Sequence, residues 1–443
     1  MVSLVAAEEL AIAQEKEKDV AQNKAPSSYS SDKLVWLPTL SVSESYDSNV
    51  FLTDPNIVRA AGLKPGDYVT TVSPQLATFS ELGVARVSLF VRGNFSSYVE
   101  NPGLNYAGVN GGLNLNLNRM VQRIEPTAGL QVFQGVLYTP VLPSSLGGVA
   151  PQPQSPDAAG ESEPLNPKSA FILGVQPVRQ NSMLTTTNVS FFDRVTPRTT
   201  LTTGFSYDRS MFFGTPAVAG APQNFSASFY GLTQSVSYQV SKVDRGIVTY
   251  AFGQSDYASQ EISNYQSHAG TAGWTHLFTP SISGTVTGGA TLVLPFNSIN
   301  QTYSGVLTWY TPVLSSSLGY SRQISPSFSS LSGPLVSDAV TAAFTAKLSQ
   351  TVFWGGSLSY SRNEVLADVG AKGKFTSYVG DAFLNYRVLS WAFASAQYRY
   401  GYYDQSFLQT SSPFQQHVVT LNFVVGIPAS SGGAGGGLPG LYR

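Results

Sequence analysis

The stretch Val109-Asn-Gly-Gly-Leu-Asn-Leu-Asn-Leu-Asn118 decides the fold that we predict for this chain. Its large apolar side chains stand at alternate positions, and asparagines fill most of the positions between them. Because successive side chains of a β-strand point to opposite faces, this strand has one apolar face and one amide face. A wall built from such strands separates lipid on one side from water on the other.

The same alternation recurs along the chain, at 86–95, 200–208, 340–349 and 394–402. The connectors between these segments alternate in length, which is typical of outer-membrane barrels with short periplasmic turns and long extracellular loops. The short connectors are expected near 81–83, 118–121, 193–198, 241–245, 279–281, 311–313, 349–351 and 389–390. The long ones are expected at 47–67, 134–180, 209–225, 323–336, 362–374 and 404–413, with shorter members of this set near 100–105, 258–264 and 294–300.

The composition supports a membrane wall and excludes other classes. Only 12% of the residues are charged, about half the usual share of a soluble protein. Past the N-terminus no apolar run approaches the roughly 20 residues of a spanning helix, so only a closed barrel satisfies the backbone in lipid. With a net charge of −1, the chain lacks the excess of basic residues that is typical of proteins that bind nucleic acid. The absence of cysteine excludes disulfides and thiolate chemistry.

These observations predict an all-β fold, a transmembrane antiparallel up-and-down β-barrel of about eighteen strands, with about sixteen as the alternative. Residues 34–427 form the barrel and place the protein in the outer membrane. Residues 1–33 are expected to be a periplasmic leader, helical or disordered, and 428–443 a flexible Gly-rich tail. The apolar start before Glu8 fits the end of a truncated signal peptide as well as an ordinary N-terminus.

Two segments near the start carry a family resemblance. They are Leu40-Ser-Val-Ser-Glu-Ser-Tyr-Asp-Ser-Asn-Val-Phe-Leu52 and Asp67-Tyr-Val-Thr-Thr-Val-Ser-Pro-Gln-Leu76. Together they resemble the outer-membrane β-barrel porins associated with exopolysaccharide-export loci, in which an acidic-aromatic-Asp-x-Asn strand precedes a strand with a Ser-Pro step. The resemblance implies export of a polysaccharide and periplasmic export components as partners. The chain departs from many such barrels in ending on a Gly-rich tail and not on an aromatic residue.

The alternation also predicts which polar side chains face the lumen. The expected pore-lining residues are Arg86, Arg92, Asn94, Asn110, Asn114, Asn116, Asp208, Lys347, Asp381, Arg387 and Arg399. Glu44 and Glu125 are expected inside as well, which leaves the pore nearly neutral and without strong ion preference. In the alternative interpretation these charges only pair across the wall. We expect the 134–180 connector, the longest, to fold into the lumen and not to project outward.

Other candidate chemistry is weak, and we expect neither an enzyme nor a cofactor or metal. His268 and His276 share a strand face with Trp274 but lie roughly 27 Å apart, too far to share a metal. A Ser–His pair of a phospholipase is conceivable only because serine is abundant. Asp47, Asn49 and Asp54 could supply oxygen ligands for Ca²⁺, but an Asx-rich turn explains the same residues and is the interpretation that we favour. The glycine run 432–437 lacks the context of a phosphate loop.

A transport barrel is therefore the leading hypothesis. Its expected partners are outer-membrane lipid and a polysaccharide or small polar solutes, because about sixteen to eighteen strands enclose an aqueous channel. One alternative is a sheath that holds a protein partner. The other is a soluble β-rich adhesive protein, whose outer strand faces would carry more charge than the serines, threonines and asparagines present here.

Overall fold

The computed structural model describes residues 35–52, 54–82, 85–117, 124–137, 180–213, 226–258, 264–325, 334–366, 374–405 and 413–426. The strands are β1 (Val35–Asp47), β2 (Asp67–Leu82), β3 (Ala85–Tyr98), β4 (Tyr106–Asn116), β5 (Ile124–Leu137), β6 (Gln180–Thr196), β7 (Thr199–Phe213), β8 (Ala227–Gln239), β9 (Asp244–Tyr257), β10 (Tyr265–Thr279), β11 (Ile282–Leu294), β12 (Ser298–Tyr310), β13 (Leu314–Ser325), β14 (Leu335–Lys347), β15 (Val352–Val365), β16 (Lys374–Leu389), β17 (Ala392–Gln405) and β18 (Phe414–Gly426). A short helix, α2 (Pro55–Ala60), and a 3-10 turn, η1 (Pro102–Leu104), complete the described elements. The predicted leader, tail and 134–180 loop lie wholly or mainly outside the described residues.

The strands form one closed antiparallel barrel of 18 strands, as the sequence predicts. Each strand pairs with its neighbours along the chain. The barrel closes where β1 pairs with β18 over nine residue pairs, from Thr39 opposite Gly426 to Asp47 opposite Val418. Closure leaves no sheet edge, so the ladder supplies partners for the backbone groups that lipid cannot satisfy.

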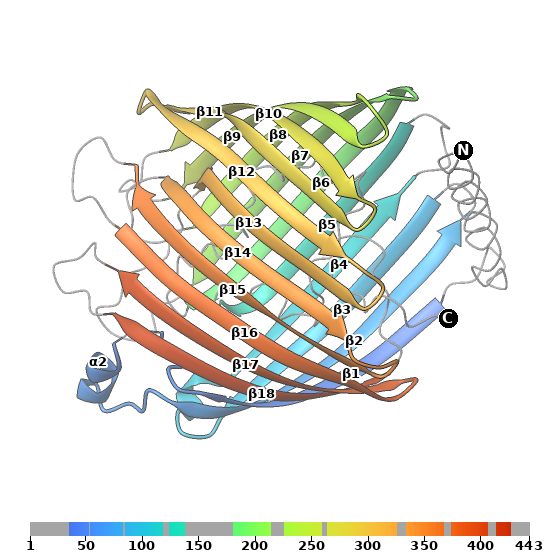
Figure 1. Ribbon diagram of the computed structural model, residues 1–443. Helices are drawn as coiled ribbons and strands as arrows, with labels where there is room; N and C mark the ends of the chain where they lie inside the picture. The colour runs from blue at the N-terminus through green and yellow to red at the C-terminus, as the bar shows by residue number, and fades with distance from the viewer. Residues whose placement is uncertain are drawn as a thin grey trace.

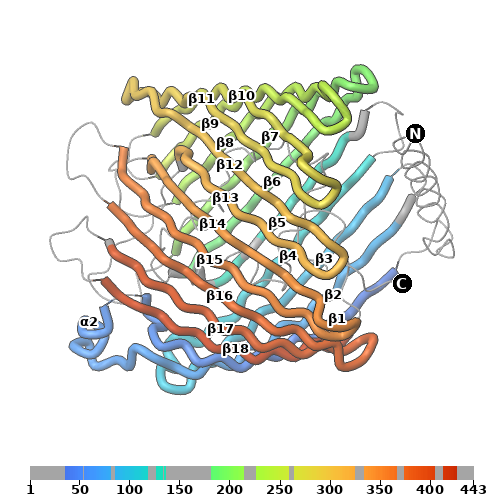
Figure 2. The backbone as a smooth tube through the Cα atoms, in the orientation of Figure 1, coloured from blue at the N-terminus to red at the C-terminus, as the bar shows by residue number. Residues whose placement is uncertain are grey.

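Short and long connectors lie at opposite rims, which confirms the predicted alternation. The short turns include 197–198, 280–281 and 390–391. They lie at the right-hand rim of Figure 1, where β1 begins and β18 ends, and α2 lies at the opposite rim. Figure 2 shows that the strands cross between these rims obliquely, as closure of a barrel requires. We name the two ends the turn rim and the loop rim.

Large apolar side chains cover the outside of the barrel. In β1, Trp36, Leu40, Val42 and Tyr46 are between 38% and 54% exposed and alternate with less exposed residues. The same alternation continues around the wall, as at Leu358, which is 68% exposed. Among the described residues no helix is long and apolar enough to cross a membrane. A closed barrel with an apolar outer belt belongs in the outer membrane, so this chain is an outer-membrane protein.

Aromatic side chains mark the two edges of this apolar belt. All five tryptophans lie near the turn rim and are between 41% and 54% exposed: Trp36, Trp274, Trp309, Trp354 and Trp391. Outward tyrosines such as Tyr46, Tyr68 and Tyr378 lie toward the loop rim. Along β1 the span from Trp36 to Tyr46 is about 25 Å for a strand tilted by 40°, the usual height of the lipid-facing band.

The belt predicts that a charge on the outer face costs stability and that the same charge on the inner face does not. Leu421 is 60% exposed near the middle of β18, and its neighbour Thr420 points inward. We expect Leu421→Arg to lower the unfolding free energy in lipid vesicles by about 2–4 kcal/mol. Thr420→Arg should change it by less than about 1 kcal/mol. Denaturant titration of both variants measures the difference, and equal losses would contradict the assignment of faces.

Candidate functional site

The inner wall of the barrel is the candidate site. The predicted pore-lining residues all lie on the strand face opposite the exposed apolar side chains: Arg86, Arg92, Asn94, Asn110, Asn114, Asn116, Asp208, Lys347, Asp381, Arg387 and Arg399. In β4, for example, the asparagines alternate with the outward Val109 and Leu113, which are 53% and 40% exposed. Their role in lining a conducting pore stays a prediction.

The structure brings together the polar residues of β3 and β4. Arg86 stands opposite Asn116, and Arg92 stands opposite Asn110. The Nε of Arg92 donates to Gln75 of β2 over 2.8 Å. The guanidinium of Arg86 lies 5.4 Å from the ring centroid of Phe79, within range of a cation–π contact. This part of the wall therefore presents fixed amide and guanidinium groups to the lumen.

Asp381 and Arg399 form a second cluster, directly opposite each other on β16 and β17. Their side chains are 7% and 8% exposed. Ser357 donates to one carboxylate oxygen of Asp381, whereas the second oxygen and two nitrogens of Arg399 have no hydrogen-bond partner. The two charges compensate each other through space without a direct hydrogen bond. Buried polar atoms of this kind are available to a solute or to water.

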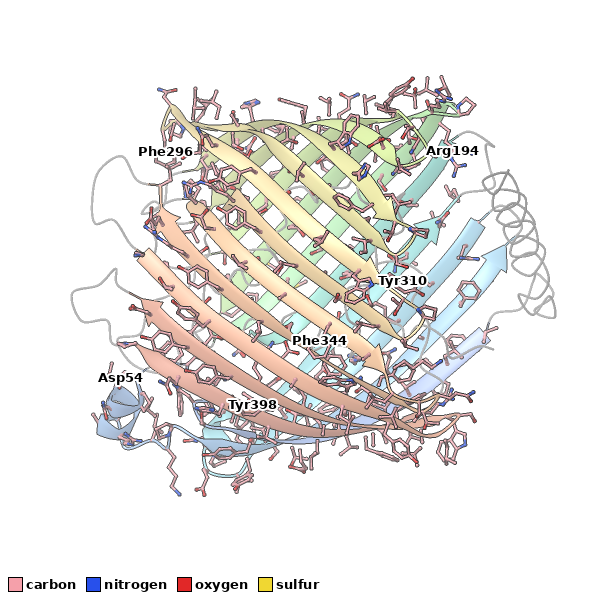
Figure 3. All side chains as sticks on the ribbon, in the orientation of Figure 1. Asp54, Arg194, Phe296, Tyr310, Phe344 and Tyr398 are labelled. Carbon is pink, nitrogen blue, oxygen red and sulfur yellow. The ribbon has the colours of Figure 1, made fainter. Side chains whose placement is uncertain are left out.

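The remaining predicted residues do not converge on one point. Asp208, 3% exposed, lies on β7, far along the strand order from β16 and β17. Lys347 and Arg387 lie near the turn rim, where Nη2 of Arg387 donates to the carbonyl of Gln350 over 3.0 Å. Figure 3 shows the two rims well apart, with Asp54 at one and Arg194 at the other. Arg86, Lys347 and Arg387 lie near the turn rim, and Asp208, Asp381 and Arg399 lie farther from it, so the predicted charges do not meet at one height of the wall.

The prediction that Glu44 faces the lumen is wrong. Glu44 shares the outward face of β1 with Val42 and Tyr46, and Thr70 of β2 donates to its carboxylate over 2.7 Å. The inward positions of β1 hold serines, and Ser41 donates to Asn422 over 2.7 Å. An acidic side chain costs less than a basic one on the lipid face, and the hydroxyl of Thr70 gives this carboxylate a hydrogen-bond partner there. The side chain of Glu125 lies outside the described residues.

The first loop, residues 48–52 and 54–66, extends the site in a way that the sequence analysis missed. Val50, Phe51 and Val58 are at most 4% exposed and pack against Val69 of β2 and Tyr98 of β3. Both partners belong to the inner face of the wall. The loop therefore buries its apolar side chains on the lumen side of the barrel.

Leu52 fixes the same loop to the opposite side of the closing seam. It is 6% exposed and packs against Val379, Tyr403 and Phe414, from the inner faces of β16, β17 and β18. Its backbone has a φ of 58°, a conformation that costs a residue other than glycine about 1 kcal/mol or more. The packing of Leu52 offsets that cost, and the first loop is held on the inner wall at the loop rim.

Acidic residues of this region act as acceptors for backbone and amide donors. Asp67, 1% exposed, accepts from the backbone N–H groups of Glu100 and Asn101 and from the Asn101 side chain, each over 2.9 Å. Asp47 accepts from the backbone of Asn49 over 2.8 Å, which is an Asx turn. These bonds give the carboxylates of Asp47 and Asp67 hydrogen-bond donors, and Asp67 ties the β3–β4 connector to β2.

A small cavity lies on the inner wall beside these residues. It has a volume of about 130 Å³. It is lined by Ser45, Asp47, Val69, Thr71, Ser96, Tyr98, Tyr106, Arg399 and Val418. These residues come from both sides of the β1–β18 seam, so the cavity joins Arg399 to the residues that carry the first loop.

The histidines lie on the outer face and not in the lumen. His268 and His276 share the outward face of β10 with Trp274, as predicted. The ring nitrogen Nδ1 of His276 is 2.7 Å from Asp244, and that of His268 is 2.9 Å from the hydroxyl of Tyr250. His417 makes a similar contact with a tyrosine. Among the described residues no histidine ring is hydrogen-bonded to a serine.

Comparison with known proteins adds a likeness in architecture. No family model and no curated protein matches the chain. Among solved structures it is similar to Pseudomonas aeruginosa OccK5 (OpdH), with 12% identity over 88% of this chain and 98% of that one and a TM-score of 0.43. OccK3 (OpdO) and OprD of the same organism score 0.45 and 0.40, each at 12% identity over 88% of this chain and 96% and 95% of theirs. These values are too low to transfer a function, and the fold rests on the chain's own strand pairing.

The packing of Leu52 predicts which substitution releases the first loop. Leu52→Asn keeps a residue that tolerates positive φ but removes the apolar contacts. We expect faster hydrogen exchange and faster proteolysis across residues 48–66. Ile57→Asn is the control, because Ile57 is 47% exposed on the same loop. Equal protection in the two variants would show that Leu52 does not hold the loop.

Proposed function

We propose that the protein is a passive channel for small polar solutes across the outer membrane. One observation carries this proposal: the barrel has 18 strands, and its inner face is lined by amide, hydroxyl and charged groups. A barrel of this width encloses an aqueous passage unless a plug fills it. The solutes would enter past the first loop and the Arg399 cavity and leave at the turn rim.

With Glu44 on the outer face, the predicted lumen residues hold five cations, Arg86, Arg92, Lys347, Arg387 and Arg399, against two anions, Asp208 and Asp381, which supports a weak preference for anions. Arg86 and Arg92 lie six residues apart on β3, while Asp208 lies on β7 and Asp381 stands opposite Arg399. Strong selectivity for ions needs a ring or a stripe of one sign. The neutral donors and acceptors between the charges suit water and uncharged hydroxylated solutes.

The narrower proposal from the family resemblance is a conduit for a polysaccharide with periplasmic partners. Its support is limited to the two resembling segments, and the structure gives one of them another role. The segment from Asp47 to Leu52 begins the first loop, which packs on the inner wall at the loop rim. Its apolar residues are buried there in packing contacts and are not exposed for contact with a threaded polymer. We therefore favour the small solute.

If the protein is a channel, water reaches every second residue of a strand, which is the residue on the inner face. The chain has no native cysteine, so Asn110→Cys places a single thiol on the inner face of β4. In planar bilayers, a charged thiol reagent should lower the single-channel current of this variant in steps. Val109→Cys, on the outer face, should not respond. A protein that inserts without conductance, or current steps from Val109→Cys, would contradict the proposal.

A further inference from the structure

A cluster of charged side chains lies on the outer wall, facing lipid and not the lumen. Arg322 of β13 stands opposite Asp338 of β14, which in turn stands opposite Arg362 of β15. Arg322 shares its strand face with Tyr320, which is 36% exposed. Arg362 shares its face with Leu358, which is 68% exposed. These exposed neighbours assign the cluster to the outside.

The side chains of the cluster are joined by hydrogen bonds. The Nη1 of Arg322 donates to both oxygens of Asp338, over 3.2 and 3.1 Å, and the hydroxyl of Tyr320 donates to the same carboxylate over 2.8 Å. In a second pair, the Nε and Nη2 of Arg362 both donate to Glu364, the former over 3.1 Å, which leaves Nη1 of Arg362 facing outward from that pair. Because Arg322 uses only Nη1 in these bonds, its Nε and Nη2 are left to bind a further anion. The side chains of Arg322 and Arg362 are 33% and 46% exposed.

The height of the cluster places it at the outer-leaflet boundary. Trp354 marks the turn rim on β15, and Arg362 lies roughly 20 Å above it for a strand tilted by 40°. The lipid-facing band is about 25 Å tall, so the cluster lies at its far edge, where headgroups meet acyl chains. Charged groups at this depth reach the polar headgroups, where they cost little and can pair with an anion.

The cluster gathers more outward charges than other parts of the same rim. The outward residues of β1 to β4 there include Tyr46, Tyr68, Ser97 and Ala107, with Glu44 as a charge two residues below Tyr46, and β7 contributes Arg209. On β13 to β16 the outward cations are Arg322, Arg362 and Lys374 against Asp338 and Glu364, an excess of one positive charge. The outward Asp404 of β17 is separated from Arg362 of β15 by the uncharged Thr376 of β16. The cluster around Arg322 and Arg362 therefore attracts an anion.

We propose that Arg322 and Arg362 bind the phosphate of a phosphorylated lipid in the outer leaflet. Guanidinium groups match phosphate oxygens with two parallel hydrogen bonds. On adjacent strands spaced by about 4.8 Å, Arg322 and Arg362 flank Asp338 at about 10 Å from each other. The carboxylate of Asp338 orients Arg322, and Tyr320 contacts the glycerol or sugar next to the phosphate. This site is independent of the channel proposal, because it lies on the other face of the wall.

Native mass spectrometry of the full chain, released from neutral detergent micelles, tests the site. The probes are a phosphorylated glycolipid and the same glycolipid with its phosphates removed. The double variant Arg322→Gln/Arg362→Gln should bind the phosphorylated probe about tenfold more weakly, the loss expected for one or two charged hydrogen bonds. Arg209→Gln, which removes an outward cation of β7, should bind it as the parent chain does.

Two further comparisons keep the outcome decisive. The variant Arg322→Lys/Arg362→Lys keeps both charges and should bind at an intermediate level, and its migration on unheated gels shows that it folds. Equal binding of the two probes, or equal binding by the parent and the Gln variant, would overturn the proposal. Oligomers of the parent that the Gln variant lacks would assign the patch to a second copy of this chain and would equally overturn it.

Discussion

The structure depends on the need to satisfy every backbone N–H and C=O group where water is absent. A strand that faces lipid can meet this need only through its two neighbours, and the last strand must meet the first. Here β1 and β18 close the barrel through nine residue pairs. Once the barrel is closed, the period of two along each strand assigns every side chain to lipid or to the lumen. The candidate functional groups follow from that assignment.

The need to satisfy backbone hydrogen bonds also explains how the first loop is held at the loop rim. A loop that enters the lumen brings polar backbone with it, so it needs partners on the inner wall. The first loop supplies apolar contacts through Val50 and Leu52 and backbone bonds such as Val50 N–H to the carbonyl of Pro65, over 2.8 Å. Asp67 then ties the neighbouring connector to β2 with three hydrogen bonds. The first loop and the β3–β4 connector are packed and hydrogen-bonded parts of the barrel.

The sequence predicts the strands and the faces well because alternation is a local signal repeated eighteen times. The sequence-based placement of Glu44 in the lumen is wrong because the polarity of one side chain does not determine which face of the strand it is on. The apolar neighbours Val42 and Tyr46 set the parity of that strand and carry Glu44 outward. The sequence also does not predict where Val50, Phe51 and Leu52 pack. These three apolar residues lie in a connector, where no strand periodicity indicates which face or which neighbour they contact. The clusters at Asp67 and at Arg322 join residues from different strands, and only the register brings them together.

Spin labels at two adjacent residues test the central claim most directly. Leu115→Cys and Asn116→Cys each introduce the only thiol of the chain, on opposite faces of β4. In lipid vesicles, the label at 115 should collide mainly with oxygen dissolved in the bilayer, and the label at 116 mainly with a water-soluble relaxation agent. Labels that report the same surroundings at both positions would contradict a barrel with a lipid face and a water face.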